Sequence, residues 1–177
     1  YAPIWGTVWD HTLSFCDGEG VISLARTCQP RIEPEVVFGL GSTPPPGATL
    51  HQLFDALDWI APGFEVVQSH QADWKFEAAH TVADSGLHAR LLVGQRLAVR
   101  SLAPAATALD ARLGASQARL SCAGVPRDQG TGAQVLDGPL HALHHFLLEL
   151  RACPGAPQLQ AGDVVTTGTW TDAWPVT

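Results

Sequence analysis

Polar and hydrophobic positions alternate most regularly over residues 29–40, and this pattern predicts a β-strand. Successive side chains of a strand point to opposite faces, so Glu33 and Glu35 are expected on the same face. Their like charges repel each other unless a divalent cation, the guanidinium of Arg31 or bulk water lies beside them. A solvated edge strand is the alternative interpretation, because Pro34 has no N–H to donate to a neighbouring strand.

Apolar side chains recur at helical spacing in two longer segments. The first covers residues 50–60 and follows a capping box that begins at Thr49. The second begins near Pro139, which suits the first turn of a helix, and carries a stripe of leucines. Strand alternation returns at residues 64–69 and places Glu65 as a third carboxylate among apolar neighbours. Further elements are predicted as a short helix at residues 78–84, strands at 89–94 and 117–124, and a turn at 125–128.

Composition narrows the class of protein. With 46% hydrophobic and 15% charged residues the chain is expected to be globular, and strands interleaved with two longer helices predict one mixed α+β domain over residues 1–177. The formal net charge of −7, without a cluster of cations, argues against nucleic acid as a partner. Neither a membrane-spanning stretch nor a secretory signal is found, so a cytoplasmic protein is expected. The absence of methionine suggests that the chain is a piece of a longer protein.

Two further features bear on chemistry. Lys75 is the single lysine beside nine arginines, and lysine can act as an acid or base because burial can remove its proton. A solvated surface cation is the simpler interpretation. On the second helix, His141, His144 and His145 lie at spacings that could ligate zinc, although no H-E-x-x-H pattern accompanies them. Solvated or capping histidines are the favoured interpretation there.

Five motifs stand together in an order typical of one enzyme family. They read QPRIEPE at residues 29–35, WIAPGFEVV at 59–67, ADW at 72–74 with TVAD at 81–84, LDGPL at 136–140, and AGD at 161–163 with TG at 167–168. In this order the chain resembles the 2-keto-4-pentenoate hydratase and 4-oxalocrotonate decarboxylase branch of the fumarylacetoacetate hydrolase superfamily. The resemblance covers most of the chain.

The resemblance implies a rolled, mostly β, mixed sheet with a metal site formed by Glu33, Glu35 and Glu65. The implied cofactor is Mg²⁺ or Mn²⁺, which agrees with a site made of carboxylate oxygens alone. The implied activity is the metal-dependent addition of water to a small 2-hydroxydienoic or 2-oxo acid such as 2-hydroxypenta-2,4-dienoate, in aromatic catabolism, and the implied assembly is a homo-oligomer. Thr167 and Gly168 are expected to contact the substrate carboxylate.

The proton-transfer groups are less well matched to the family. Hydratases carry an aspartate where this chain has Ile4, and Ala-Asp-Asn-Ala-Ser where it has residues 83–87. The family also has an N-terminal segment that supplies a lysine, and C-terminal strands, that we do not find here. Lys75, Asp84 and Ser85 are therefore the candidate catalytic residues. Decarboxylation of 4-oxalocrotonate, hydrolysis of an acylpyruvate carbon–carbon bond, and a non-catalytic metal-binding subunit are the alternative functions.

Overall fold

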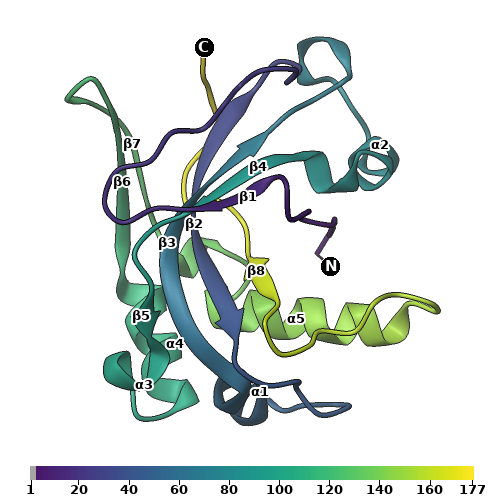
Figure 1. The fold of residues 1–177 in the computed structure, drawn as a ribbon, viewed down its shortest axis with the longest axis vertical. Helices are drawn as coiled ribbons and strands as arrows, with labels where there is room; N and C mark the ends of the chain where they lie inside the picture. The colour runs from purple at the N-terminus through teal and green to yellow at the C-terminus, as the bar shows by residue number, and fades with distance from the viewer. Residues whose placement is uncertain (1–2) are drawn as a thin grey trace.

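The long antiparallel pair of strands β2 (Arg31–Leu40) and β3 (Leu57–Val67) forms the centre of the fold. The computed structural model describes residues 3–177 (Figure 1). Its main sheet runs in the order β1–β4–β3–β2–β8, with β5 paired to β3 and β9 paired to β2. The smaller strands of this sheet are β1 (Leu13–Phe15), β4 (His88–Val93), β5 (Leu97–Ala98), β8 (Val164–Thr166) and β9 (Trp174–Pro175).

Helices pack against one face of this sheet and form the main core with it. The amphipathic α5 buries the predicted leucine stripe against Phe38 of β2, with α1 and α4 beside it. In Figure 1, α1, α3, α4 and α5 lie together around the lower half of the sheet, whereas α2 lies apart at the upper right. The helices are α1 (Leu50–Ala56), α2 (Ala78–Ala83), α3 (Val99–Leu102), α4 (Ala106–Ala115) and α5 (Pro139–Ala152).

Short elements complete the described chain. A separate two-stranded sheet consists of β6 (Gln117–Cys122) and β7 (Val125–Thr131) and projects as a hairpin on the left of Figure 1. The 3₁₀ turns are η1 (Ala72–Trp74), η2 (Ser85–Leu87) and η3 (Gly132–Gln134).

The predicted helix over residues 50–60 is wrong beyond Ala56, because β3 begins at the next residue. Leu57 and Ile60 have helical spacing, but they pair with β2 and β5 instead. The indole of Trp59 packs against Gly39, so closely that a Cβ atom there would be 2.0 Å from the ring. This close approach favours the strand. The two longer helices are consequently α4 and α5, of which α5 matches the prediction.

The predicted turn over residues 125–128 is also wrong. The turn of the hairpin lies just before this segment, at Ala123 and Gly124, which have φ angles of 50° and 79°. Glycine accepts such positive φ angles at little cost, so Gly124 is a suitable turn residue. Residues 125–128 therefore belong to β7 despite the proline at 126.

The edge-strand interpretation of residues 29–40 is contradicted, because β2 has partners on both sides. On one side it pairs with β3 throughout, and on the other it pairs with β8 at residues 37–39 and with β9 at residues 31–32. Residues 33–36 face a gap between these two short pairings. Pro34 lies in the gap, where no strand requires its missing N–H, and its carbonyl accepts the N–H of Trp170 at 3.0 Å.

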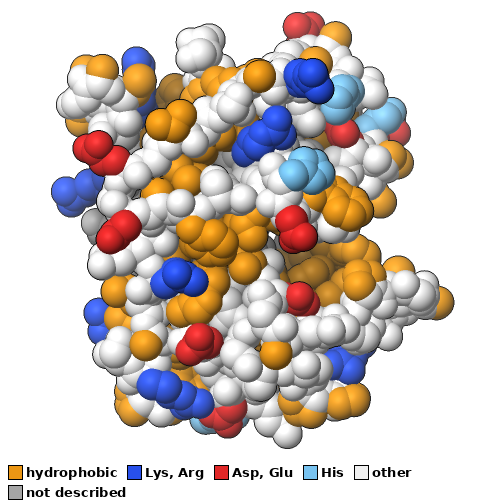
Figure 2. Space-filling view, viewed as in Figure 1, with side chains coloured by type: hydrophobic (Ala, Val, Ile, Leu, Met, Phe, Trp, Pro, Cys, Tyr) orange, Lys and Arg blue, Asp and Glu red, His pale blue; other side chains and the backbone are white. Residues whose placement is uncertain are grey.

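Hydrophobic side chains also reach the surface. Figure 2 shows them gathered in the middle of the face viewed, with charged side chains dispersed around them. None of the helices in residues 3–177 is long and apolar enough to cross a membrane.

Candidate metal centre

The register of β2 and β3 brings the three predicted glutamates together. Glu33 lies directly opposite Glu65, and Glu35 lies opposite Gly63. Because the side-chain period of a strand is two, all three carboxylates extend from the same face of the sheet. One oxygen from each lies within 4.8 Å of the others. Gly63 has no side chain, and a Cβ atom added there would lie 2.6 Å from a methyl group of Val37.

Two of the three glutamates are buried, and Glu33 is partly buried. Glu35 and Glu65 are 5% and 9% exposed. Burial, and then repulsion from the neighbouring carboxylates, raises the pKa of each of Glu33, Glu35 and Glu65 to about 8. Bulk water was one of the three candidates for offsetting the repulsion between the glutamates, and the burial of Glu35 and Glu65 largely excludes it. The guanidinium of Arg31 lies over the ring of Trp74, 4.2 Å from its centroid. It lowers the pKa of Glu33 alone, and this effect is the smallest of those that shift the pKa of Glu33.

The end of β8, with the segment that follows it, holds Glu35. It lies beside the gap opposite residues 33–36, and the backbone N–H of Gly168 donates to Glu35 Oε2 at 2.8 Å. The hydroxyl of Thr166 donates to the same oxygen. Both hydrogen bonds favour the ionised carboxylate and partly oppose the effect of burial on its pKa.

A histidine from the adjacent strand holds Glu65. His88, the first residue of β4, places Nδ1 2.6 Å from Glu65 Oε1. Its Nε2 lies 2.8 Å from the hydroxyl of Thr12. Burial, with a contribution from Arg90, lowers the pKa of His88 to about 4. Both partners are therefore shifted towards their neutral forms when no cation is bound.

The hydrogen bonds and ion pairs of the three candidate catalytic residues are with residues outside the carboxylate cluster. The side chain of Lys75 is 82% exposed, and its Nζ lies 3.6 Å from Asp73. Ser85 accepts a hydrogen bond from the backbone N–H of Thr7 at 3.0 Å. Asp84 caps the end of α2, and both of its carboxylate oxygens contact His70 Nδ1, at 2.8 and 3.0 Å.

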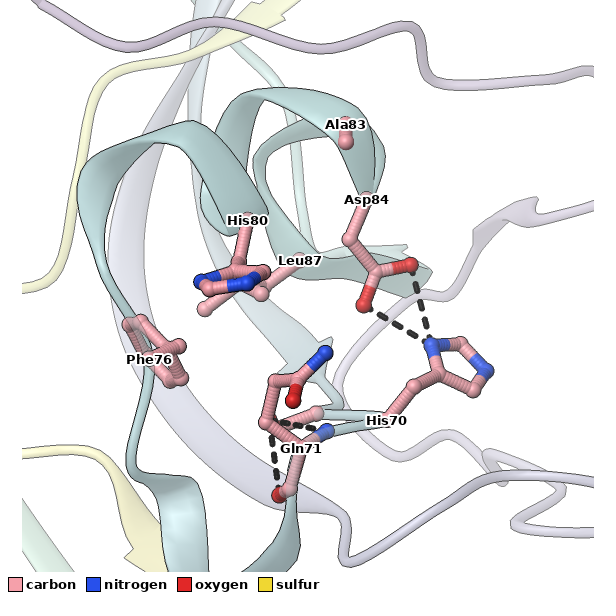
Figure 3. A pocket seen from close by; sticks show the side chains of 8 residues that line it. His70, Gln71, Phe76, His80, Ala83, Asp84 and Leu87 are labelled. Carbon is pink, nitrogen blue, oxygen red and sulfur yellow. Dashed lines mark hydrogen bonds and ion pairs between the residues drawn. The ribbon is translucent and has the colours of Figure 1, made fainter.

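Asp84 and His70 line a separate cavity of about 290 Å³ (Figure 3). The figure shows the dashed contacts between the two side chains, with His80 and Phe76 on the opposite side of the cavity. His80 accepts the backbone N–H of Glu77 through Nδ1 at 3.0 Å. Residue spacing alone did not indicate that His70 would be the partner of Asp84, because 14 residues separate them.

The other residues predicted to bind substrate or metal also contact groups within the protein. Gly168 donates its N–H to Glu35, and the hydroxyl of Thr167 faces the carbonyl of Val36 at 3.5 Å. The three histidines of α5 do not converge. They contact three different groups, namely Asp110, the carbonyl of Ala48 and Asp137. Within residues 3–177, the three glutamates are the one set of His, Cys, Asp or Glu residues close enough to share an ion.

The comparisons with known proteins place the chain among hydratases and decarboxylases. A 2-hydroxyhexa-2,4-dienoate hydratase of Comamonas testosteroni is 32% identical over 170 residues, covering 95% of this chain and 60% of that protein. A 2-keto-4-pentenoate hydratase of Paraburkholderia xenovorans LB400 is 32% identical over 94% of this chain and 58% of its own length. A 4-oxalocrotonate decarboxylase of Pseudomonas sp. CF600 is 30% identical over 98% of this chain and 62% of its own length. The chain is related to these hydratases and decarboxylases over nearly its whole length.

Solved structures of 4-oxalocrotonate decarboxylase from Pseudomonas putida G7 have the same fold. The form complexed with calcium and acetate has a TM-score of 0.74 at 25% identity, covering all of this chain and 62% of the decarboxylase. The form complexed with magnesium and adipate has a TM-score of 0.73 at 24% identity, covering 97% of this chain and 61% of that one. No protein-family model matches the chain.

These findings confirm the family predicted from the five sequence motifs. They also confirm a mixed fold of α-helices and β-strands that is built around a central β-sheet. The chain spans about three fifths of the length of the curated relatives that it matches.

Proposed function

We propose that Glu33, Glu35 and Glu65 bind one divalent cation, and that the protein is a hydratase of 2-hydroxypenta-2,4-dienoate or a similar small 2-oxo acid. The observation that carries the proposal is the convergence of three carboxylates, two of them buried, within 4.8 Å of one another. Three acidic groups buried together destabilise the fold when they ionise, as their raised pKa values indicate. A cation in the space between them would offset that cost.

The donor set suits a hard cation. Carboxylate oxygens are preferred by Mg²⁺, Mn²⁺ and Ca²⁺, and neither sulfur nor imidazole belongs to the cluster. Hydrogen bonds to protein groups already hold one oxygen of Glu35 and one of Glu65, so both side chains are oriented without the ion. The similarity to a decarboxylase solved with magnesium and with calcium supports a divalent ion. Mn²⁺, the alternative to Mg²⁺ that the resemblance implies, stays a prediction.

An ion bound here would supply positive charge opposite the negative charge that develops on the 2-oxygen of a 2-oxo acid during reaction. The protein's own residues orient that centre and move protons. Of the three candidate acid–base groups, Asp84 has the geometry best suited to proton transfer, because its carboxylate holds Nδ1 of an imidazole at 2.8 Å. Contact of Thr167 and Gly168 with the substrate carboxylate stays a prediction.

Decarboxylation of 4-oxalocrotonate is the second candidate. It is favoured by the similarity of the fold to solved structures of that decarboxylase. Hydration and decarboxylation both develop negative charge on the same substrate oxygen, so the metal centre serves either reaction. The same comparisons support our inference that the sheet is the rolled sheet of the fumarylacetoacetate hydrolase superfamily.

The test is an assay with the protein encoded by the full gene. We expect Mg²⁺-dependent loss of diene absorbance from 2-hydroxypenta-2,4-dienoate without release of carbon dioxide. Carbon dioxide from 4-oxalocrotonate would select the decarboxylase instead, and cleavage of an acylpyruvate would select the hydrolase. A protein that binds Mg²⁺ but converts none of these acids would be a non-catalytic subunit, and the proposed activity would be refuted. The E35Q variant is the control, because it removes one ligand charge and keeps the side-chain volume.

The cytoplasmic location, the homo-oligomer and the single-domain organisation of residues 1–177 stay predictions from the sequence. Size-exclusion chromatography with light scattering would test the oligomer directly.

A further inference from the structure

A buried chain of hydrogen bonds leads from the carboxylate cluster into the protein. It runs from Glu65 Oε1 to His88 Nδ1 at 2.6 Å, and from His88 Nε2 to the hydroxyl of Thr12 at 2.8 Å. The side chain of His88 is 5% exposed and Thr12 is buried. His88 therefore reaches Glu65 from inside the protein.

Both ends of this chain are fixed by the sheet. Thr12 closes a turn in which its N–H donates to the carbonyl of Trp9, and its own carbonyl accepts the N–H of Leu91 in β4. At the other end, the pairing of β3 with β4 is irregular between Val66 and Val67, next to His88. The irregularity brings His88 opposite Val67, two residues along β3 from Glu65, and its imidazole reaches Glu65 from this position.

The hydrogen-bond chemistry selects one form of the imidazole when Glu65 acts as a metal ligand. A ligand carboxylate is ionised and can only accept hydrogen bonds, so Nδ1 of His88 must carry the hydrogen that lies towards Oε1. In the neutral ring Nε2 is then an acceptor. The hydroxyl of Thr12 is 2.8 Å away and can donate to it, although the carbonyl of Trp9 also lies 2.8 Å from that hydroxyl.

We propose that His88 is a positioning residue for the metal centre, in which Thr12 fixes the imidazole as the Nδ1–H tautomer and that tautomer orients the carboxylate of Glu65. The inference rests on the proposed metal centre and assigns a role to two residues outside it. His88 does not bind the ion. Its hydrogen bond occupies Oε1 of Glu65, as Gly168 occupies one oxygen of Glu35. Removing a residue that hydrogen-bonds a metal ligand weakens metal affinity about 10- to 100-fold.

The experiment measures Mn²⁺ affinity from the electron paramagnetic resonance signal of the free ion, with the full protein. H88L removes the donor and should weaken binding about 10- to 100-fold. H88N places an amide N–H close to the position of Nδ1 and should restore most of the affinity. T12V removes the donor to Nε2 and should weaken binding by less than H88L.

A matched control separates positioning from a general loss of structure. His144 of α5 is partly buried and hydrogen-bonds the carbonyl of Ala48, far in sequence from the glutamates. H144L should leave Mn²⁺ affinity unchanged, even if its metal-free melting temperature falls. Melting curves of all variants without metal would show whether H88L is still folded.

Four results decide the inference. Weaker binding by H88L with rescue by H88N supports it, and equal binding by wild type, H88L and T12V overturns it. Two-bond proton–nitrogen NMR spectra of the Mg²⁺-loaded wild type give a second measurement, since a His88 ring protonated at Nε2 and bare at Nδ1 would also overturn it. A wild-type protein that binds no Mn²⁺ would instead refute the metal centre, and the inference with it.

Discussion

Without metal, the stability of the fold should fall as the pH rises through the range in which the three glutamates ionise. Each has a pKa of about 8 in the folded protein, above the ordinary value of 4.5. The folded state therefore holds protons that the unfolded state releases. The stabilisation from the protonated carboxyls is complete below about pH 4.5 and is lost as the pH approaches and passes 8.

The magnitude can be worked for Glu35, which is almost fully buried. A carboxyl with these two pKa values loses about 3 kcal/mol of its contribution to the free energy of unfolding between pH 5.5 and pH 8.5. For a domain of this size each kcal/mol corresponds to about 2–4 °C in melting temperature. Replacing Glu35 by glutamine keeps an oxygen that can accept from Gly168 and Thr166 but removes the charge. Metal-free E35Q should therefore lose about 6–12 °C less than wild type over this pH range.

Differential scanning calorimetry in EDTA at several pH values is the assay, and E19Q, a substitution of an exposed glutamate, is the control. Added Mg²⁺ should offset most of this loss in the wild type at pH 8.5, because the ion stabilises the wild type by about 2.7 kcal/mol when present at 100 times its dissociation constant. E35Q should gain less. A wild-type melting temperature that stays level or rises from pH 5.5 to 8.5, or parallel curves for wild type and E35Q, would refute the reasoning.

Three further changes test other parts of the site. T166V removes the hydroxyl that donates to Glu35 and should weaken Mg²⁺ binding about 10-fold or more in isothermal titration calorimetry, whereas an unchanged affinity would exclude that role. G63A places a Cβ atom 2.6 Å from a methyl group of Val37 and should cost about 1–3 kcal/mol in urea unfolding; full stability would contradict the tight packing there. D84N should lower turnover about 100-fold or more while Mg²⁺ affinity stays the same, and a fully active variant would exclude Asp84 as the acid–base group.

The strand that carries Glu33 and Glu35 could be predicted from the sequence because its period of two is local. The same holds for α5, where a proline in the first turn and a regular leucine stripe both indicate a helix. The boundary between α1 and β3 could not be predicted in this way. Leu57 and Ile60 fit a helical period. The packing of Trp59 on Gly39 of the neighbouring strand favours the strand at residues 57–60, and the sequence alone does not show this contact.

The three glutamates of the carboxylate cluster could be predicted from the sequence, but the residues that hydrogen-bond them could not. Glu65 could be matched to Glu33 and Glu35 from the strand pattern together with the resemblance to the family. His88 and Thr12 gave no such signal, because their contact with the cluster depends on an irregular register between β3 and β4. Thr166 was overlooked for a similar reason, since its hydroxyl reaches Glu35 only where β8 ends at the gap in the pairing of β2.

That gap has a consequence for how the protein acquires its site. The contact that holds Glu35 joins residues 133 positions apart, and the contact of His88 with Thr12 joins residues 76 apart. Contacts between such distant parts of a chain form late in folding, because the intervening loops must be closed first. Tight capture of a cation should therefore mark the completion of folding, and partly folded chains should release it.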